Sequence, residues 1–333
     1  MTKVRPRNAL ARAGTFSRFI AQQRRERPRI GAELGTPGAG VRLDGSETAW
    51  TDSGVRVTTG ETFRVAATGA AWLSAPLALG FEPRTALWVR IGGTMQVARP
   101  VENDWVFTAW ASGPVELMIK GLSEWADAGG ALLPGKRPKL GAGIAAEVVR
   151  GGAAVAQVVP DDWSYLWRIG NARQVSEAGG ELTVSTRGDV GILCRDVDVP
   201  LTATTRLDWQ WCVDALPSAL PEDLAMTHDY LSIAAEFDNG QDLTYMWSAG
   251  LAEGHVFACP LDWWCDRETH WVLRSGAAGL GDWHSESRGL AADYAHAIGG
   301  DLPTKVTRVW LIANSVFQRR EGRARFRAID VAS

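Results

Sequence analysis

The amino-acid sequence predicts a mostly β protein, built as two antiparallel, jelly-roll-like β-sandwich domains joined by a linker rich in glycine and proline. The chain has 333 residues, more than one hydrophobic core usually organises. Two series of short segments alternate apolar and polar residues, and turns rich in Gly, Pro, Asp and Asn separate them. We therefore expect a basic N-terminal arm over residues 1–40, a first sandwich over 41–120, a linker over 121–160 and a tryptophan-rich second sandwich over 161–333.

The arm is set apart by its charge. Residues 1–29 hold nine Lys and Arg residues and one acid, Glu26, so this stretch carries +8 while the rest of the chain carries −11. One apolar stripe of a short helix could be formed by Leu10, Phe16, Phe19 and Ile20. We expect the arm to pack on an acidic surface of the same chain or of a second subunit in a homo-oligomer. Contact with a membrane surface or nucleic acid is the alternative.

Composition narrows the class of protein. The net charge of −3 creates no global field for nucleic acid, so no nucleic-acid partner is expected. No stretch of about 18 apolar residues could span a membrane, and no apolar core of a secretory signal is present, which predicts a cytoplasmic protein. The four cysteines should then be reduced thiols. Cys259 and Cys265 lie close together, but no paired Cys-x-x-Cys accompanies them, so we expect structural thiols, no metal and no cofactor.

The predicted strands follow in order along both series. In the first sandwich they cover residues 54–60, 62–68, 86–92, 105–110 and 115–120. In the second they cover residues 181–185, 204–213, 230–237, 243–247, 271–275, 306–313 and 323–331. One short helix is expected over residues 290–298. Gly-Gly and Pro-Gly sequences punctuate residues 121–160, as expected of a connector that is ordered in part.

The first sandwich resembles the bacterial galactose-binding PA-I type lectins. The likeness lies in Trp50-Thr-Asp-Ser-Gly-Val55, Ala66-Ala-Thr-Gly-Ala-Ala-Trp72 and Val106-Phe-Thr-Ala-Trp110. This resemblance implies a lectin-type fold in which a late loop binds calcium and a sugar. The corresponding stretch, residues 121–129, offers Glu124 and Asp127 but no asparagine. Because calcium takes six to eight oxygen ligands, we expect no calcium requirement.

The second sandwich is similar to a bacterial family catalogued as domain of unknown function 3047. The likeness covers about residues 204–331 and lies in Leu207-Asp-Trp-Gln-Trp-Cys-Val213, Tyr245-Met-Trp247 and the block of Trp283, Arg288 and Asp293-Tyr294. Members of that family tend to carry a paired acidic motif and a late Asp-x-Asp. This chain has Thr227-His-Asp229 and Ala313-Asn-Ser315 at those places. The resemblance implies that this chain keeps the fold of the family but carries different polar side chains at these two places.

Two polar clusters could carry acid–base chemistry. His228 titrates near neutrality and can exchange protons, and Asp229 could assist it, although strand neighbours point to opposite faces. Glu286 or Asp293 could face His228 across a concave sheet. The catalytic candidates are therefore His228, Asp229, Glu286 and Asp293. The structural alternative for His228 and Asp229 is a polar loop before a strand. For Asp293 it is a cap of the short helix. No Gly-x-Ser-x-Gly, His-Glu-x-x-His, Walker loop or dinucleotide motif is present.

The chain has sixteen tryptophans, and seven of them, between Trp209 and Trp283, suggest a ligand site in the second sandwich. Indole rings stack on sugars and on apolar skeletons, so some of them could line a pocket. The predicted ligand-binding residues are Trp209, Trp211, Tyr230, Tyr245, Trp247, Trp283 and Arg288. The leading hypothesis is recognition of a small apolar or sugar-like molecule. If the protein is an enzyme, its candidate residues fit cofactor-free acid–base chemistry of the lyase, isomerase, cyclase or glycoside-type hydrolase kind. A carbohydrate-binding module and a structural or assembly protein remain alternatives.

Overall fold

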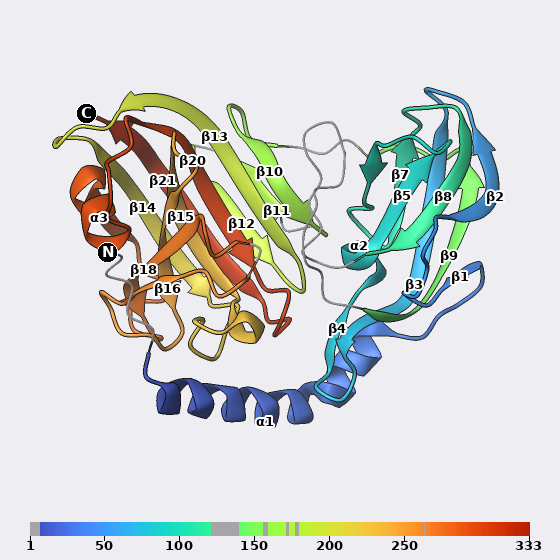
Figure 1. Cartoon of the computed structure of the whole chain (residues 1–333), viewed down its shortest axis with the longest axis horizontal. Helices are drawn as coiled ribbons and strands as arrows, with labels where there is room; N and C mark the ends of the chain where they lie inside the picture. Colours follow the sequence, from blue (N-terminus) through green and yellow to red (C-terminus); the bar gives the residue numbers. More distant parts are fainter. Residues whose placement is uncertain (1–6, 121–139, 156–158, 171–172, 177–179, 263) are drawn as a thin grey trace. The chain divides into compact units, whose positions relative to one another are not determined.

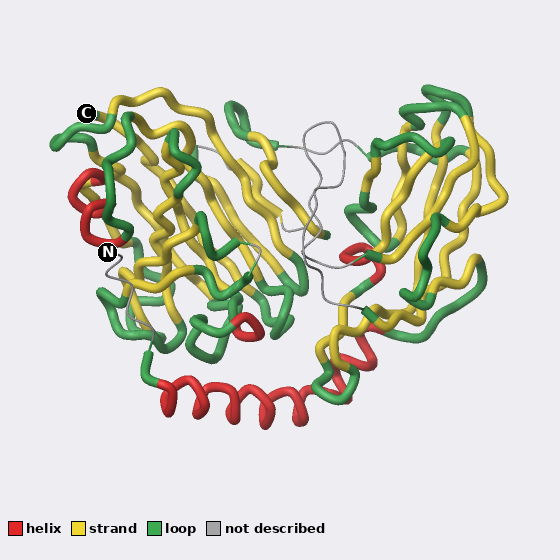
Figure 2. The backbone as a smooth tube through the Cα atoms, in the orientation of Figure 1, coloured by secondary structure: helices red, strands yellow, loops and turns green. Residues whose placement is uncertain are grey.

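The computed structural model describes residues 7–120, 140–155, 159–170, 173–176, 180–262 and 264–333 (Figure 1). The chain forms two compact units. The first, here called the N-terminal sandwich, covers Ile20–Gln157. The second, here called the C-terminal sandwich, covers Val158–Ser333 together with Met1–Phe19. Strands dominate both (Figure 2), so the predicted mostly β fold is confirmed. No helix in the described part of the chain combines the length and the apolar character needed to cross a membrane.

The N-terminal sandwich contains two antiparallel sheets. The first has the order β1 (Val41–Leu43), β9 (Gly141–Arg150), β3 (Thr62–Ser74), β4 (Leu79–Phe81), with β7 (Asp104–Thr108) also paired to β3. The second has the order β2 (Thr51–Val57), β8 (Gly113–Ile119), β5 (Leu87–Ile91), β6 (Val97–Ala98). A single helical turn, α2 (Pro83–Ala86), precedes β5.

Part of the expected linker is a strand of this sandwich. β9 pairs with β3 over ten residues, from Phe63 opposite Arg150 to Trp72 opposite Gly141. The reason is burial, because Ile144, Ala145 and Ala146 have no exposed surface. Their apolar side chains belong to the core and not to a connector. Residues 121–139, with Glu124 and Asp127, lie outside the described residues.

The C-terminal sandwich also contains two sheets. The seven-stranded sheet has the order β10 (Ser164–Ile169), β13 (Val190–Pro200), β20 (Lys305–Asn314), β15 (Tyr230–Phe237), β16 (Asp242–Ser248), β18 (Glu268–Ser275), β17 (Val256–Ala258). The five-stranded sheet has the order β11 (Arg173–Ser176), β12 (Leu182–Thr186), β21 (Gly322–Ala332), β14 (Arg206–Ala215), β19 (His284–Gly289). The predicted helix is confirmed as α3 (Leu290–Ala297), and a 3-10 turn, η1 (Ala225–Thr227), precedes β15.

One strand pair departs from the expected antiparallel arrangement. β16 and β18 run parallel, and β17 then pairs antiparallel with β18 at the edge of the sheet. Parallel neighbours need a crossover connection. Here the chain between Ala249 and Arg267, which includes β17, makes that crossover.

The seven-stranded sheet buries both of its faces. Leu231 and Ile233 of β15 face the five-stranded sheet and join the main core with Trp209 and Trp211. Tyr230 and Ala234 belong to a second core on the opposite face, here called the outer face, with Phe257 and Leu251 of the crossover among its members. Because side chains alternate along a strand, residues two apart share a face.

The basic arm is a long helix, α1 (Ala9–Leu34), and not a short one. Phe19 is fully buried, whereas Leu10 is 86% exposed and Phe16 is 42% exposed, so the four predicted residues do not form one buried stripe. The start of the arm contacts the C-terminal sandwich, where Arg7 pairs with Asp223. An acidic contact within the same chain matches the expectation from charge, and a role in joining subunits stays a prediction.

Candidate metal centre

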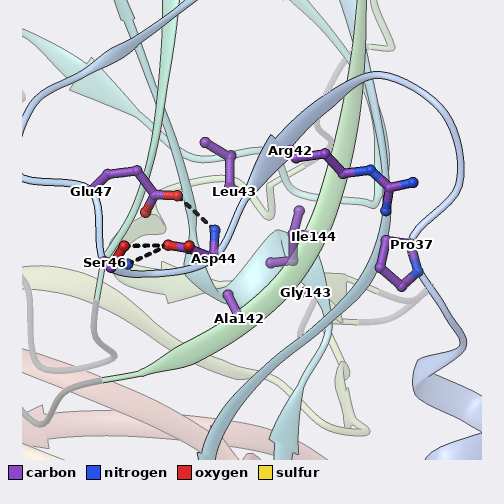
Figure 3. A pocket seen from close by; sticks show the side chains of 9 residues that line it. All are labelled: Pro37, Arg42, Leu43, Asp44, Ser46, Glu47, Ala142, Gly143 and Ile144. Carbon is purple, nitrogen blue, oxygen red and sulfur yellow. Dashed lines mark hydrogen bonds between the residues drawn. The ribbon is translucent and has the colours of Figure 1, made fainter.

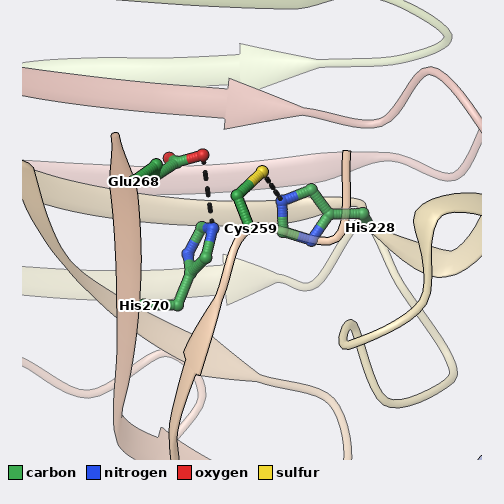
Figure 4. A group of neighbouring side chains, drawn as sticks. All are labelled: His228, Cys259, Glu268 and His270. Atoms are coloured by element: carbon green, nitrogen blue, oxygen red, sulfur yellow. Dashed lines mark hydrogen bonds and ion pairs between the residues drawn. The ribbon is translucent and has the colours of Figure 1, made fainter. Parts of the chain in front are cut away.

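Four side chains that commonly ligate metals converge on the outer face of the seven-stranded sheet. They are His228, Cys259, Glu268 and His270, all buried, and one ligand atom from each lies within 4.8 Å of the others (Figure 4). The figure shows the four side chains pointing toward one another; Glu268 and His270 come from β18 and the other two from two further segments.

Strand register brings these groups together. Glu268 and His270 lie two residues apart on β18, so both project from the same face. Cys259 follows β17, and its backbone N–H donates to the Glu268 carbonyl at 2.9 Å, which places the thiol beside that pair. His228 is the residue after η1, and its ring lies 4.7 Å from the His270 ring, centroid to centroid.

The protein fixes the tautomer of His228. Nδ1 lies 2.8 Å from the backbone carbonyl oxygen of Glu222, which can only accept a hydrogen bond. Nδ1 therefore carries the proton, and Nε2 keeps its lone pair and faces Cys259 Sγ at 3.5 Å. A ring whose Nδ1–H donates to a carbonyl while Nε2 faces another ligand residue type is typical of metal-binding histidines.

The two carboxylate oxygens of Glu268 also have different surroundings. Its Oε1 accepts hydrogen bonds from the Tyr230 hydroxyl at 2.9 Å and from Thr244 Oγ1 at 3.4 Å. Its Oε2 has no hydrogen-bond partner, and neither ring nitrogen of His270 has one, although all three atoms are buried. His270 Nε2 approaches Oε2 to 3.4 Å without hydrogen-bond geometry. Glu268 Oε2 and the His270 ring nitrogens are therefore open to a shared cation, and His228 Nε2 would become so once the Cys259 thiol loses its proton.

Burial and mutual charge set the protonation of this cluster. Burial, with a contribution from His270, lowers the pKa of His228 to about 3, so its imidazole is neutral. Burial alone would raise the pKa of Glu268, but the neighbouring His270, with Nε2 3.4 Å from Oε2, outweighs it and the pKa is lowered. Burial raises the pKa of the Cys259 thiol, so without a cation the thiol keeps its proton. A neutral imidazole and an ionised carboxylate are the forms that bind metals, and a cation would displace the thiol proton.

The donor set suits one class of metal. Two imidazole nitrogens, one thiolate and one carboxylate oxygen suit zinc, which prefers four such ligands in a tetrahedron. Bond lengths of about 2.0–2.3 Å imply ligand–ligand separations of roughly 3.3–3.8 Å. The four atoms, within 4.8 Å of one another, would thus close by less than about 1.5 Å. Four buried protein ligands leave no open coordination position, as in structural zinc sites.

The predicted catalytic residues do not come together. Asp229 points away from His228, as strand alternation predicts, and its carboxylate accepts backbone N–H groups of Phe317 at 3.0 Å and Gln318 at 2.6 Å. Burial raises the pKa of Asp229 to about 7 despite these bonds. The contact fixes the turn after β20, which is a structural role.

Glu286 and Asp293 lie on the other side of the seven-stranded sheet, among the residues between the two sheets. Glu286 Oε1 accepts hydrogen bonds from Trp211 Nε1 at 3.2 Å and from Arg274 at 2.7 Å. Asp293 accepts a bond from the Tyr245 hydroxyl at 2.7 Å and two from Arg288. The expected pairing of either carboxylate with His228 is therefore wrong, because a packed sheet separates them.

Most of the predicted ligand aromatics fill the main core. Trp209, Trp211, Tyr245 and Trp247 are at most 1% exposed. Trp209 stacks on Tyr245 and Trp211 packs on Trp247, with ring centroids 5.6 and 5.7 Å apart. Rings buried in this way show no face to a ligand.

The other three predicted ligand residues have different surroundings. Tyr230 holds Glu268 on the outer face. Trp283 is half-buried under the Arg327 guanidinium, 3.9 Å from the ring centroid, and Arg288 lies over Trp271. Ligand contact by Trp283 and Arg288 stays a prediction.

A shallow cavity of about 350 Å³ lies in the N-terminal sandwich beside β1 and β9 (Figure 3). Its polar lining includes Arg42, Asp44 and Glu47. The Glu47 carboxylate accepts the backbone N–H groups of Asp44 and Gly45, and Asp44 accepts two bonds from Ser46. These carboxylates thus serve first to shape their own loop.

Sequence reasoning missed three of the four candidate ligands. His228 was selected for proton transfer, and Cys259 was considered only together with Cys265. Cys265 bonds instead to Asp262 and Asp266. The available signal was Glu268-Thr-His270, two ligand residue types at the spacing that shares a strand face.

Comparison with known proteins confirms the resemblance of the second sandwich. Residues 171–330 match the family described as "Protein of unknown function (DUF3047)". No curated protein matches the chain. The resemblance of the first sandwich to PA-I type lectins stays a prediction.

Several solved structures align with part of this chain at 11% sequence identity. The xyloglucanase domain of NopAA from Sinorhizobium fredii aligns with 53% of this chain and 94% of its own, at a TM-score of 0.34. The family 11 carbohydrate-binding module of the cellulase Lic26A-Cel5E of Clostridium thermocellum aligns with 54% and 96%, at 0.28. SGBP-B from a xyloglucan utilization locus of Bacteroides uniformis aligns with 83% and 70%, also at 0.28.

Proposed function

We propose that the C-terminal sandwich is a metal-binding module that holds one divalent cation of the zinc class between His228, Cys259, Glu268 and His270. The observation that carries this proposal is the state of the ligand atoms. In both His228 and Glu268 one polar atom is held by a group outside the cluster, while the other faces its centre: Glu268 Oε2 has no hydrogen bond, and His228 Nε2 meets only the Cys259 thiol at 3.5 Å. Such outer bonds orient metal ligands and raise their basicity.

The closed ligand set favours a structural role for the metal. The ligands come from three segments: the turn before β15, the end of β17 and the start of β18. A cation bound by all of them ties the crossover between Ala249 and Arg267 to the outer face of the sheet. Metal binding to sites that exist only in the folded state stabilises the fold.

Metal analysis of the purified protein tests the proposal. After exchange into zinc and removal of excess by gel filtration, plasma mass spectrometry should find about one zinc ion per chain, the occupancy of a four-ligand site. His270→Ala and Cys259→Ser should lose the zinc. The matched control is Cys265→Ser, the same change six residues away and outside the cluster, which should keep it. Folded wild-type protein without zinc, or equal zinc in all variants, would overturn the proposal.

A second candidate function is recognition of a small polar or sugar-like ligand by the N-terminal sandwich. The cavity beside β1 and β9 favours it, because its volume of about 350 Å³ falls within the usual range for small-molecule sites. Arg42 supplies an exposed cation at its edge. Calorimetric titration with galactose and with simple anionic sugars tests this candidate, and Arg42→Ala should weaken any binding seen. No heat with any of them would count against it.

A further inference from the structure

The N-terminal arm is anchored to the turn that carries one of the candidate ligands. The Arg7 guanidinium pairs with both carboxylate oxygens of Asp223, with Nε to Oδ2 at 2.7 Å. The Arg7 side chain is 19% exposed and that of Asp223 is 5% exposed, so the pair is largely shielded from water. Arg7 also donates to Thr15 Oγ1 at 3.0 Å, which ties the anchor to the first turns of α1.

One route runs from this anchor to His228 and Cys259 through the neighbouring residue, Glu222. The Glu222 carbonyl holds Nδ1 of His228 at 2.8 Å. The fully buried Glu222 carboxylate accepts bonds from Ser248 Oγ and from the Ala249 backbone N–H. Ala249 begins the crossover that leads to Cys259. A shift of the backbone at 222–223 would therefore move two of the candidate ligands.

A second route runs through stacked rings. His255 lies close enough to the anchor that its pKa responds to it: burial lowers the pKa, the Asp223 charge raises it and the Arg7 charge lowers it. The His255 ring stacks on Phe257 with centroids 5.6 Å apart, and Phe257 stacks on His270 at 4.8 Å. This column leads from His255, which feels the charges of the anchor, to a third candidate ligand, His270.

We propose that docking of the N-terminal arm through Arg7 and occupation of the metal centre are coupled, so that each favours the other; this inference rests on the proposed function. The coupling is reciprocal because both events fix the same segments, residues 222–228 and 249–259. Metal release loosens the turn under the arm, and arm release lowers the affinity for metal. The arm then acts as a clamp whose state reports metal loading.

Zinc affinity and arm protection, measured on the full chain, test the coupling. Competition with a chromophoric chelator should show that Arg7→Ala and Asp223→Asn bind zinc about 5-fold or more weakly than wild type, within the usual range of coupling. Arg12→Ala, a charge removal elsewhere on the arm, is the matched control and should leave zinc affinity unchanged. Trypsin should cleave the arm of the wild type faster in chelator than in zinc, and His270→Ala should abolish this difference.

The outcomes separate the two proposals. If wild type binds zinc and Arg7→Ala, with an intact far-ultraviolet spectrum and a rapidly cleaved arm, binds it equally well, the coupling is overturned while the metal centre stands. If folded wild type binds no zinc, both proposals fall. Asp223→Asn guards against a folding defect in the first variant, because it keeps the shape of the side chain while removing the charge.

Discussion

Tyr230→Phe should weaken metal binding without disturbing the fold. The Tyr230 hydroxyl donates to Glu268 Oε1 at 2.9 Å, and the remaining bond to that oxygen, from Thr244, is longer at 3.4 Å. Loss of a partner that orients a metal ligand costs 10–100-fold in metal affinity. That factor corresponds to about 1.4–2.8 kcal/mol. The phenyl ring itself remains packed among the residues of the outer core.

The assay compares melting in zinc with melting in chelator. At a free zinc concentration of about 1,000 times the wild-type dissociation constant, zinc adds about 4 kcal/mol to the free energy of unfolding. In Tyr230→Phe this increment should fall to roughly 1.4–2.7 kcal/mol. Tyr294→Phe is the control, since it removes a buried hydroxyl bonded to Asn239 elsewhere in the sandwich. An unchanged zinc increment in Tyr230→Phe, or an equal loss in the control, would refute the reasoning.

Three further predictions concern stability. Asp229→Ala should lower the free energy of unfolding by about 1–3 kcal/mol for each backbone N–H it leaves unpaired, at Phe317 and Gln318, and urea titration measures it; no change would show that the loop finds other partners. Trp211→Ala should cost about 3–5 kcal/mol in the same titration, because the ring is fully buried; a small cost with a lost ligand response would restore its predicted binding role. Gly69→Ala should lower the melting temperature of the N-terminal sandwich, because φ is +93° and a Cβ would lie 2.0 Å from the Gly143 carbonyl oxygen; an unchanged transition would contradict the β3–β9 pairing.

Alternation along single strands was enough to predict most of the fold. The predicted bounds of β15 and of the last strand, β21, lie close to the observed ones, although only β21 alternates between buried and more exposed residues and β15 is buried at every position. Local patterns placed β9 in a linker, because glycines at both ends of the strand imitate turn signals. What decides the role of β9 is its pairing with β3, some eighty residues earlier, and local sequence does not carry that information.

The site was harder to predict than the fold for a related physical reason. Strand periodicity correctly predicted that the side chains of His228 and Asp229 point in opposite directions. It does not say which face of a sheet a residue occupies once both faces are buried. Glu286 and Asp293 were therefore matched to His228 across a sheet that in fact divides them. The true neighbours of His228 depend on the parallel pairing of β16 with β18, which follows from the crossover and not from any short pattern.

The strongest reason to expect a cation is the cost of the cluster without one. Oε2 of Glu268 and both ring nitrogens of His270 are buried without hydrogen bonds. A buried polar atom without a hydrogen bond costs about 1–3 kcal/mol. The contact of His270 Nε2 with Glu268 Oε2 at 3.4 Å recovers part of this cost for two of the three atoms. The whole net stability of a domain is only about 5–15 kcal/mol. A bound zinc ion contributes about 10–16 kcal/mol in small zinc-dependent folds, which is enough to offset that cost. An apolar core of the same volume would avoid the cost altogether, so conservative replacement of His270 and Glu268 together by Leu and Met should stabilise the metal-free protein while abolishing zinc binding. If that double variant is instead less stable in chelator than the wild type, the polar cluster is satisfied without a cation and the argument for the metal centre loses its energetic basis.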